Sequence, residues 1–180
     1  MDILKILSLI AYVRSTNAVD EVLECNKDWE DANNIGLGYL WIDTTAKLNF
    51  TEAETFCTDK NSSLIEIDSV EQLDFIARRL KDVSEVQDVL PDRDGSIHWW
   101  GGATDVQEEG TWKWTQSGRT FDSTSFVWGD GQPNNAGGEE DYFCFWNKVD
   151  YLGNDCYGGF FHYPLCQQKM YVCILYQLNV

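Results

Sequence analysis

The hydrophobic and polar positions between residues 51 and 80 repeat with the period of an α-helix in two segments. Residues 51–54 (TEAE) have the form of a capping box, which predicts a first helix that begins at Thr51. Residues 69–72 (SVEQ) form a second capping box, which predicts another helix after Ser69. The pattern places these apolar side chains on the buried faces: Ala53, Phe56 and Cys57 in the first helix, and Leu73, Ile76, Ala77 and Leu80 in the second.

The pattern differs outside the two helices. Residues 64–67 (LIEI) predict a short strand, and the polar residues 81–96 predict a surface loop. From Ile97 onward, short aromatic runs alternate with turns rich in Gly, Asp and Asn. These runs lie at residues 99–100, 112–114 and 126–128. We therefore expect two helices followed by short strands with long loops, which is an α+β fold class.

The composition indicates one globular domain. The chain has 180 residues, of which 43% are hydrophobic and eight are Trp, and this excludes a disordered chain. Its formal net charge of −17 repels phosphate backbones and anionic membranes, so nucleic acid is not an expected partner and membrane insertion is not expected.

Six cysteines indicate three disulfides and an oxidising compartment, hence a secreted, extracellular protein. The apolar run at the start predicts a signal peptide over residues 1–18, because it is too short to span a membrane. This leaves a single domain over residues 19–180. Two sequons, at Asn49 and Asn61, predict N-glycosylation.

Oxygen donors crowd residues 129–141 (GDGQPNNAGGEED). Gln132 and Asn134 flank Pro133, and Asn154 and Asp155 follow further along the chain. Calcium takes six to eight oxygen ligands, whereas the histidine and free thiolate that zinc prefers are missing from this segment. Composition alone leaves two interpretations open, namely a calcium site and a solvated acidic loop.

Several motifs resemble those of the C-type lectin-like domain, in the same order. Residues 100–105 (WGGATD) resemble the family's Trp-Ile-Gly-Leu strand and the start of its long loop. Residues 109–114 (EGTWKW) resemble its Glu-Gly-x-Trp-x-Trp segment, and residues 132–141 resemble its proline motif and acidic turn. The resemblance runs from about Cys25 to Cys173. It implies a disulfide-stapled α+β fold with a long calcium-binding loop region that binds carbohydrate.

The resemblance also implies site residues. The main calcium site would be Gln132, Asn134, Glu140, Asn154 and Asp155, and the first four of these would also bind the sugar. An auxiliary calcium site, which shares Glu140, would use Asp105, Glu109, Asn135 and Asp141. The motif Gln-Pro-Asn lies between the family's mannose-type Glu-Pro-Asn and galactose-type Gln-Pro-Asp, so both classes of glycan remain open.

The sequence departs from the family pattern in four places. Asn135 stands where a carboxylate is usual, and Gly153 replaces the Trp of a Trp-Asn-Asp triplet. Two residues that usually separate that Asp from the next Cys are missing before Cys156. Conversely, Tyr142 and Phe143 are extra residues between Asp141 and Cys144.

The family's disulfide pattern implies the pairs Cys57–Cys166, Cys144–Cys156 and Cys25–Cys173. The rival assignment is Cys57–Cys173, Cys144–Cys166 and Cys25–Cys156. Connectivity does not follow from sequence alone, so both assignments stay open at this point.

Three classes of function compete. The resemblance favours calcium-dependent carbohydrate binding in recognition of glycans on cells or microbes, and it leaves both a monomer and an oligomer open. The alternative is a calcium-independent domain that binds a protein or another surface. An enzyme is not expected, because the two histidines, His98 and His162, lie in no recognisable nucleophile or metal pattern. Residues 92–95 (DRDG) resemble an EF-hand start, but the other ligands of such a loop are missing.

Overall fold

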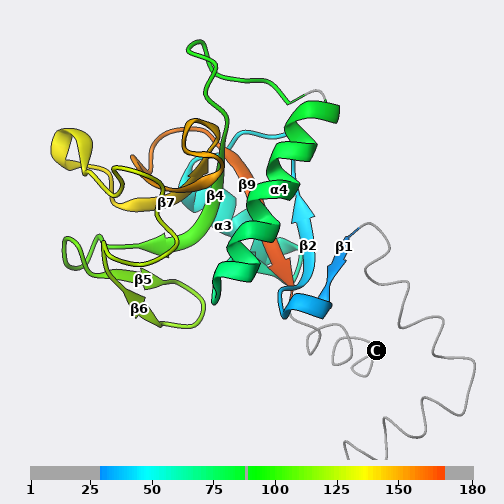
Figure 1. Cartoon of the computed structure of the whole chain (residues 1–180), viewed down its shortest axis with the longest axis horizontal. Coiled ribbons are helices and arrows are strands. Elements are labelled where there is room, and N and C mark those ends of the chain that lie inside the picture. Colours follow the sequence, from blue (N-terminus) through cyan, green and yellow to red (C-terminus); the bar gives the residue numbers. More distant parts are fainter. Residues whose placement is uncertain (1–28, 88, 169–180) are drawn as a thin grey trace, which may run out of the picture.

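The computed structural model describes residues 29–87 and 89–168 (Figure 1). The predicted signal peptide and the predicted Cys25–Cys173 bridge lie outside the described residues. The strands are β1 (Glu30–Ala32), β2 (Gly38–Ile42), β3 (Ser63–Leu64), β4 (His98–Thr104), β5 (Trp112–Trp114), β6 (Thr120–Phe121), β7 (Tyr142–Trp146), β8 (Leu152–Cys156) and β9 (Tyr163–Gln168). The helices are α3 (Phe50–Asp59) and α4 (Val70–Val86), with short 3-10 turns η1 (Asn33–Ile35), η2 (Ala136–Gly138) and η3 (Asn147–Val149).

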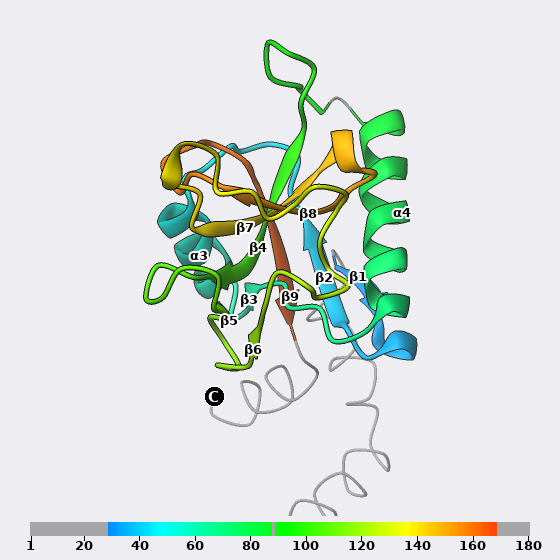
Figure 2. The ribbon, with the colours of Figure 1, turned by 60° about the vertical axis from the view of Figure 1, so that its left-hand side comes forward.

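The strands form one branched sheet in the order β1-β2-β9-β4-β5-β6, with β3 on β9 and the β7–β8 hairpin on β4. Strands β4 and β9 run parallel, with Trp99 opposite Tyr163, and the other pairs are antiparallel. Helices α3 and α4 lie on opposite sides of the β2–β9 region (Figure 2). The architecture is α+β, as expected. Neither helix, nor any other in the described part of the chain, has the length and apolarity to cross a membrane.

The two capping boxes differ in outcome. Helix α3 begins at Phe50 rather than at Thr51, because Asn49 caps it: the Asn49 side chain accepts from the Glu52 N–H, and the Glu52 carboxylate accepts from the Asn49 N–H. Helix α4 begins after Ser69 as predicted, with the Ser69 hydroxyl accepting from the Gln72 N–H. The predicted capping box is incomplete, because the Gln72 Oε1 accepts from the Asp68 N–H instead of the Ser69 N–H.

Three further predictions were wrong in extent. Helix α4 runs to Val86, so the surface loop begins later than residue 81; its buried stripe of Leu73, Ile76 and Leu80 continues to Val83. Strand β3 covers only Ser63–Leu64, although the residues after it stay buried. Residues 126–128 form no strand, because the only ladder contact there is an isolated bridge between Trp128 and Gly153.

Two disulfides lie among the described residues. Cys57–Cys166 joins α3 to β9, and Cys144–Cys156 joins β7 to β8. These are the two pairs of the first assignment, and both exclude the rival one. In the chain-entropy view, the bridge that closes 109 residues restricts the unfolded chain more than the one that closes 12.

Candidate functional site

The loop of residues 129–141 is held at its base by β8. The Gly129 N–H donates to the Gly153 carbonyl at 2.8 Å, and the Gly153 N–H donates to the Val127 carbonyl at 2.8 Å. A Cβ at Gly153 would lie 2.5 Å from the Phe143 ring and 2.6 Å from the Val127 carbonyl. The glycine in place of the family's Trp is therefore required by close packing against the extra residue Phe143.

The two changes in spacing around the second disulfide compensate each other. Strand β7 gains two residues before Cys144 and β8 loses two after Asp155, while the two strands pair antiparallel with Cys144 opposite Asn154. A shift of two residues keeps every side chain on its original face of a strand. The hairpin can therefore still present Asp155 to the loop.

Asp155 connects the hairpin to the proline motif. Its Oδ2 accepts from the Asn134 N–H at 2.8 Å and also from the Asn135 N–H. Its other oxygen, Oδ1, is buried and has no hydrogen-bond partner among the described residues, and the residue is 1% exposed. A buried carboxylate oxygen without a partner is costly, and a cation is one way to satisfy it.

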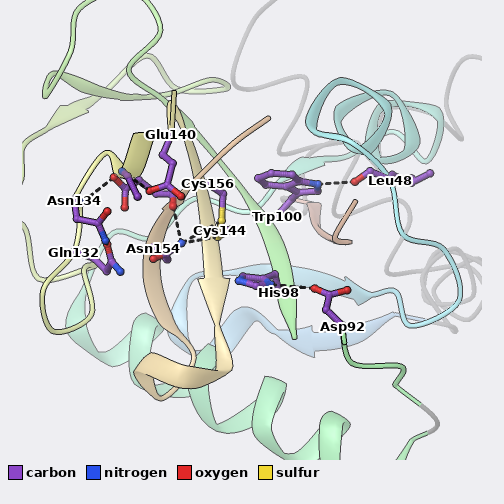
Figure 3. The surroundings of a disulfide bond; sticks show 12 residues. Leu48, Asp92, His98, Trp100, Gln132, Asn134, Glu140, Cys144, Asn154 and Cys156 are labelled. Atoms are coloured by element: carbon purple, nitrogen blue, oxygen red, sulfur yellow. Dashed lines mark hydrogen bonds and ion pairs between the residues drawn. A yellow bond between two sulfur atoms is a disulfide. The ribbon is translucent and has the colours of Figure 1, made fainter. Parts of the chain in front are cut away.

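The two amides of the proline motif lie together above this carboxylate. The peptide bond between Gln132 and Pro133 is cis, and the Asn134 Nδ2 donates to the Gln132 Oε1 at 2.7 Å. Asn134 is exposed and Gln132 half-buried, so both amides are open to a ligand from solvent. Figure 3 shows Gln132, Asn134, Glu140 and Asn154 gathered on one side of the disulfide.

Glu140 closes the loop and adds a second carboxylate. Its Oε2 accepts from the Ala136 N–H at 2.8 Å, and its own N–H donates to the Asn135 Oδ1 at 3.1 Å. Burial raises the pKa of the Glu140 carboxyl, the Ala136 bond lowers it, and the negative charge of Asp155 raises it further. Two neighbouring carboxylates and two amide oxygens fit a hard divalent cation such as calcium.

The predicted auxiliary residues form a second group. Asp105 is 3% exposed; its Oδ2 accepts from the Gly110 N–H, and its Oδ1 has no partner within the described part of the chain. Burial raises the pKa of the Asp105 carboxyl, which the charges of Glu109 and Asp141 raise further against the effect of the Gly110 bond. Glu109 and Asp141 therefore each lie close enough to repel the Asp105 carboxylate, and a cation would relieve that repulsion. The Asn135 Oδ1 already accepts from the Glu140 N–H, which leaves it one lone pair for an ion.

Asn154 is placed differently from the other predicted ligands. It is 8% exposed, and its Nδ2 donates to the Asp155 carbonyl at 2.6 Å and lies 3.3 Å from the Cys156 Sγ. Its amide nitrogen is thus engaged at the base of the site. Two aromatic residues precede Cys144 in β7. Phe143 is fully buried, and the Tyr142 ring packs on the Phe50 ring with the centroids 4.5 Å apart.

One group of residues has no precedent in the sequence pattern. The structure brings His98 and His162 together with Asp92. Asp92 lies in the segment of residues 92–95, which lacks the other ligands of an EF-hand loop. The positions are 6 and 64 residues apart, so no short motif could reveal the group. Only the parallel pairing of β4 with β9, which sequence reasoning did not foresee, makes them neighbours.

Known proteins resemble this chain in sequence and in fold. Residues 46–168 match the family described as Lectin C-type domain. The chain is 27% identical over 133 residues to the hepatic lectin of Gallus gallus, covering 74% of this chain and 56% of that protein. It also spans about a quarter of the C-type lectin domain family 4 member M of Nomascus concolor.

Solved structures show the same fold. The carbohydrate-recognition domain of mouse scavenger receptor C-type lectin superposes with a TM-score of 0.61 at 26% identity, over 81% of this chain and 96% of that one. The calcium-independent C-type lectin SPL-2 from Saxidomus purpuratus gives a TM-score of 0.59 at 21% identity, over 79% of this chain and 91% of that one.

Proposed function

Because this chain belongs to the C-type lectin domain family, we propose that it binds carbohydrate through a calcium ion held between the loop of residues 129–141 and β8. The observation that carries this proposal is Asp155. Its Oδ1 is buried without a partner among the described residues, its Oδ2 accepts from the Asn134 N–H, and its charge raises the pKa of the neighbouring Glu140.

The residues divide the work as follows. Asp155 and Glu140 would supply negative charge that matches a divalent ion, and both are preorganised by backbone N–H groups of the same loop. Bound calcium would offer open coordination positions to two neighbouring sugar hydroxyls. Gln132 and Asn134 would bind the same hydroxyls, since an amide can both donate and accept.

Sugar class is not fixed by these amides. In the structure the Gln132 Oε1 accepts from the Asn134 Nδ2, so the pair already contains one donor and one acceptor. Mannose-type and galactose-type hydroxyl pairs differ in the direction they require. Rotation of both amides together reverses the direction of this bond, and we propose that binding is tolerant of both classes.

We further propose that the protein binds the glycan without catalysing a reaction on it. We also propose that it is secreted, because disulfides form in an oxidising compartment. A glycan array in calcium and in chelator tests it. The matched variants are Glu140→Gln, which removes a proposed ligand, and Glu139→Gln, which changes the exposed carboxylate next to it. We expect binding by wild type and by Glu139→Gln in calcium, and none by Glu140→Gln or in chelator.

A second candidate is calcium-independent binding of a protein or another surface ligand. The direct bond between Gln132 and Asn134 favours it, because these amides satisfy each other without an ion. A chain with a similar fold is described as calcium-independent. Binding that persists in chelator, on the array or to a protein ligand, would support this candidate over the first.

A further inference from the structure

The strand register places the two histidines of the chain side by side. Trp99 of β4 lies opposite Tyr163 of β9 in a parallel pair. Parallel strands keep corresponding residues in step, so the preceding residues, His98 and His162, are also neighbours. Their rings stack with centroids 4.4 Å apart.

Both rings are buried with a nitrogen unsatisfied. His162 is 4% exposed, and the His98 side chain is 13% exposed. The His98 Nδ1 and the His162 Nε2 have no hydrogen-bond partner within residues 29–87 and 89–168. Two buried polar atoms that lack partners at the same place require a physical explanation.

The third member of the group is the carboxylate of Asp92, in a loop that two backbone hydrogen bonds close. The Asp92 N–H donates to the Ser96 carbonyl at 2.7 Å, and the Gly95 N–H donates back to the Asp92 carbonyl at 2.9 Å. The Lys47 ammonium holds the Asp92 Oδ1 at 2.7 Å. The Oδ2 faces the His98 Nδ1 at 3.7 Å, which is too long for a hydrogen bond (Figure 3).

We propose that Asp92, His98 and His162 form a site for a borderline divalent transition metal, with zinc as the representative ion. One donor atom from each residue lies within 4.8 Å of the others. A tetrahedral zinc ion with ligands at about 2.0–2.1 Å needs donors about 3.3 Å apart. The two rings are stacked at an interplanar angle of 26°, so both must turn out of the stack to direct their in-plane lone pairs at one ion. The partly exposed Asp92 leaves the fourth position to water.

The donor types exclude calcium here and favour zinc, copper or nickel, because neutral imidazole suits those ions. Burial lowers the pKa of His98 to about 4 and that of His162 to about 2, so both rings are neutral at pH 7 and able to bind metal. Asp94 also raises the pKa of His98, but its carboxylate pairs with Lys148. The positive charge of Lys47 opposes the ion and limits its affinity.

The site differs from the calcium region in position as well as in chemistry. Figure 3 shows His98 and Asp92 on the other side of the disulfide from Gln132, Asn134 and Glu140. Zinc bound there would link the loop after α4 and the adjoining start of β4 to the residue before β9, His162, which lies 64 residues after His98.

Calorimetric titration of the untagged full chain with zinc chloride, in saturating calcium, tests the proposal. We expect one zinc ion per chain. Asp92→Asn and His98→Gln should each weaken its affinity at least about 100-fold, because each removes a ligand. Glu140→Gln should bind zinc as wild type does, even if it binds neither calcium nor sugar, so the two proposals fail independently.

Zinc X-ray absorption of the wild-type protein gives a second test that needs no variant. It should show two imidazole ligands per zinc. The proposal is overturned if wild type binds no zinc, if the Asp92 and His98 variants bind it with unchanged affinity, if Glu140→Gln abolishes it, or if the spectrum lacks imidazole.

Discussion

Two groups of candidate ligands lie on either side of the Cys144–Cys156 disulfide, and they are built from opposite chemistry. The loop group offers carboxylate and amide oxygens, and burial raises the pKa of Glu140. The histidine group offers two imidazoles and one carboxylate, and burial lowers the pKa of His98 to about 4. Burial acts in the same sense in both, since it disfavours the charged form.

The difference shows what selects a metal in a small domain. A hard cation needs several negative or polar oxygens, which the loop group holds in readiness with backbone N–H groups. A borderline cation needs neutral nitrogens, which the histidine group keeps buried and without hydrogen-bond partners among the described residues. If both proposals hold, the two ions would not compete for ligands.

Glu140→Gln should produce the largest difference between the two groups, because it should weaken calcium binding and leave zinc binding unchanged. Removing one of the two carboxylates of the main site should weaken calcium affinity about 100-fold, or about 2.7 kcal/mol. Calorimetric titration with calcium measures this, with Glu139→Gln as the control. A Glu140→Gln protein that keeps wild-type calcium affinity would place the ion elsewhere.

Acid should destabilise the histidine side of the metal-free protein. The folded pKa of His98, about 4, lies below its unfolded value of about 6.5, so the unfolded chain binds more protons between these values. The contribution of the neutral His98 ring to the free energy of unfolding is complete above pH 6.5 and is lost as pH falls toward 4. At pH 5 the loss is about 2 kcal/mol for this ring.

Urea unfolding in chelator at pH 7 and pH 5 measures this effect. His98→Gln lacks the titrating ring, so its stability should fall less between the two pH values than that of wild type. Asp92, Asp94 and Lys47 act on the ring, and His162, whose pKa burial also lowers, stacks on it; all four are present in both proteins and serve as a common background. An equal fall in wild type and variant would refute the assignment.

Gly153→Ala should damage the loop side more than the histidine side. The new methyl group would overlap the Phe143 ring and the Val127 carbonyl, at a cost of about 1–3 kcal/mol in the free energy of unfolding. Because Gly153 also anchors Gly129, calcium affinity should fall while zinc affinity holds. Titrations with both ions measure this, and an equal loss for both would show that the groups are not independent.

Lys47→Gln should give the smallest effect and the opposite sign. It removes a positive charge from the Asp92 carboxylate, and zinc affinity should rise about two- to fivefold, as for a partly exposed ion pair worth about 0.5–1 kcal/mol. Calcium affinity should not change. Zinc affinity that falls in this variant would mean that Lys47 supports the site instead of opposing it.

The sequence predicted the contiguous parts of this molecule well. Ser69 and the stripe from Leu73 to Leu80 follow from local capping and helical periodicity, and α4 contains them as expected. The start of α3 was misplaced because Asn49 and Thr51 both have capping side chains, and only the Asn49 bond to Glu52 decides between them. The end of α4 was not predicted, because polar residues at 81, 82, 84 and 85 surround Val83, the one buried residue after Leu80 in this helix.

The candidate ligands also divide into residues that are close in sequence and residues that only the fold brings together. Gln132, Asn134 and Glu140 lie within nine residues, so one loop brings them together and the sequence reveals them. The register of β8 was not predictable, because two opposite changes in spacing cancel only when β7 and β8 pair. The histidine group was invisible, since it depends on a parallel pairing of strands that are distant in sequence.

Glycan binding through calcium held at Asp155 and Glu140 is best tested on one preparation, measured in calcium alone, in zinc alone and in chelator. We expect binding in calcium, and none in zinc or chelator. Binding that survives chelation, or that zinc alone sustains, would rule out this calcium site as the carrier of glycan binding.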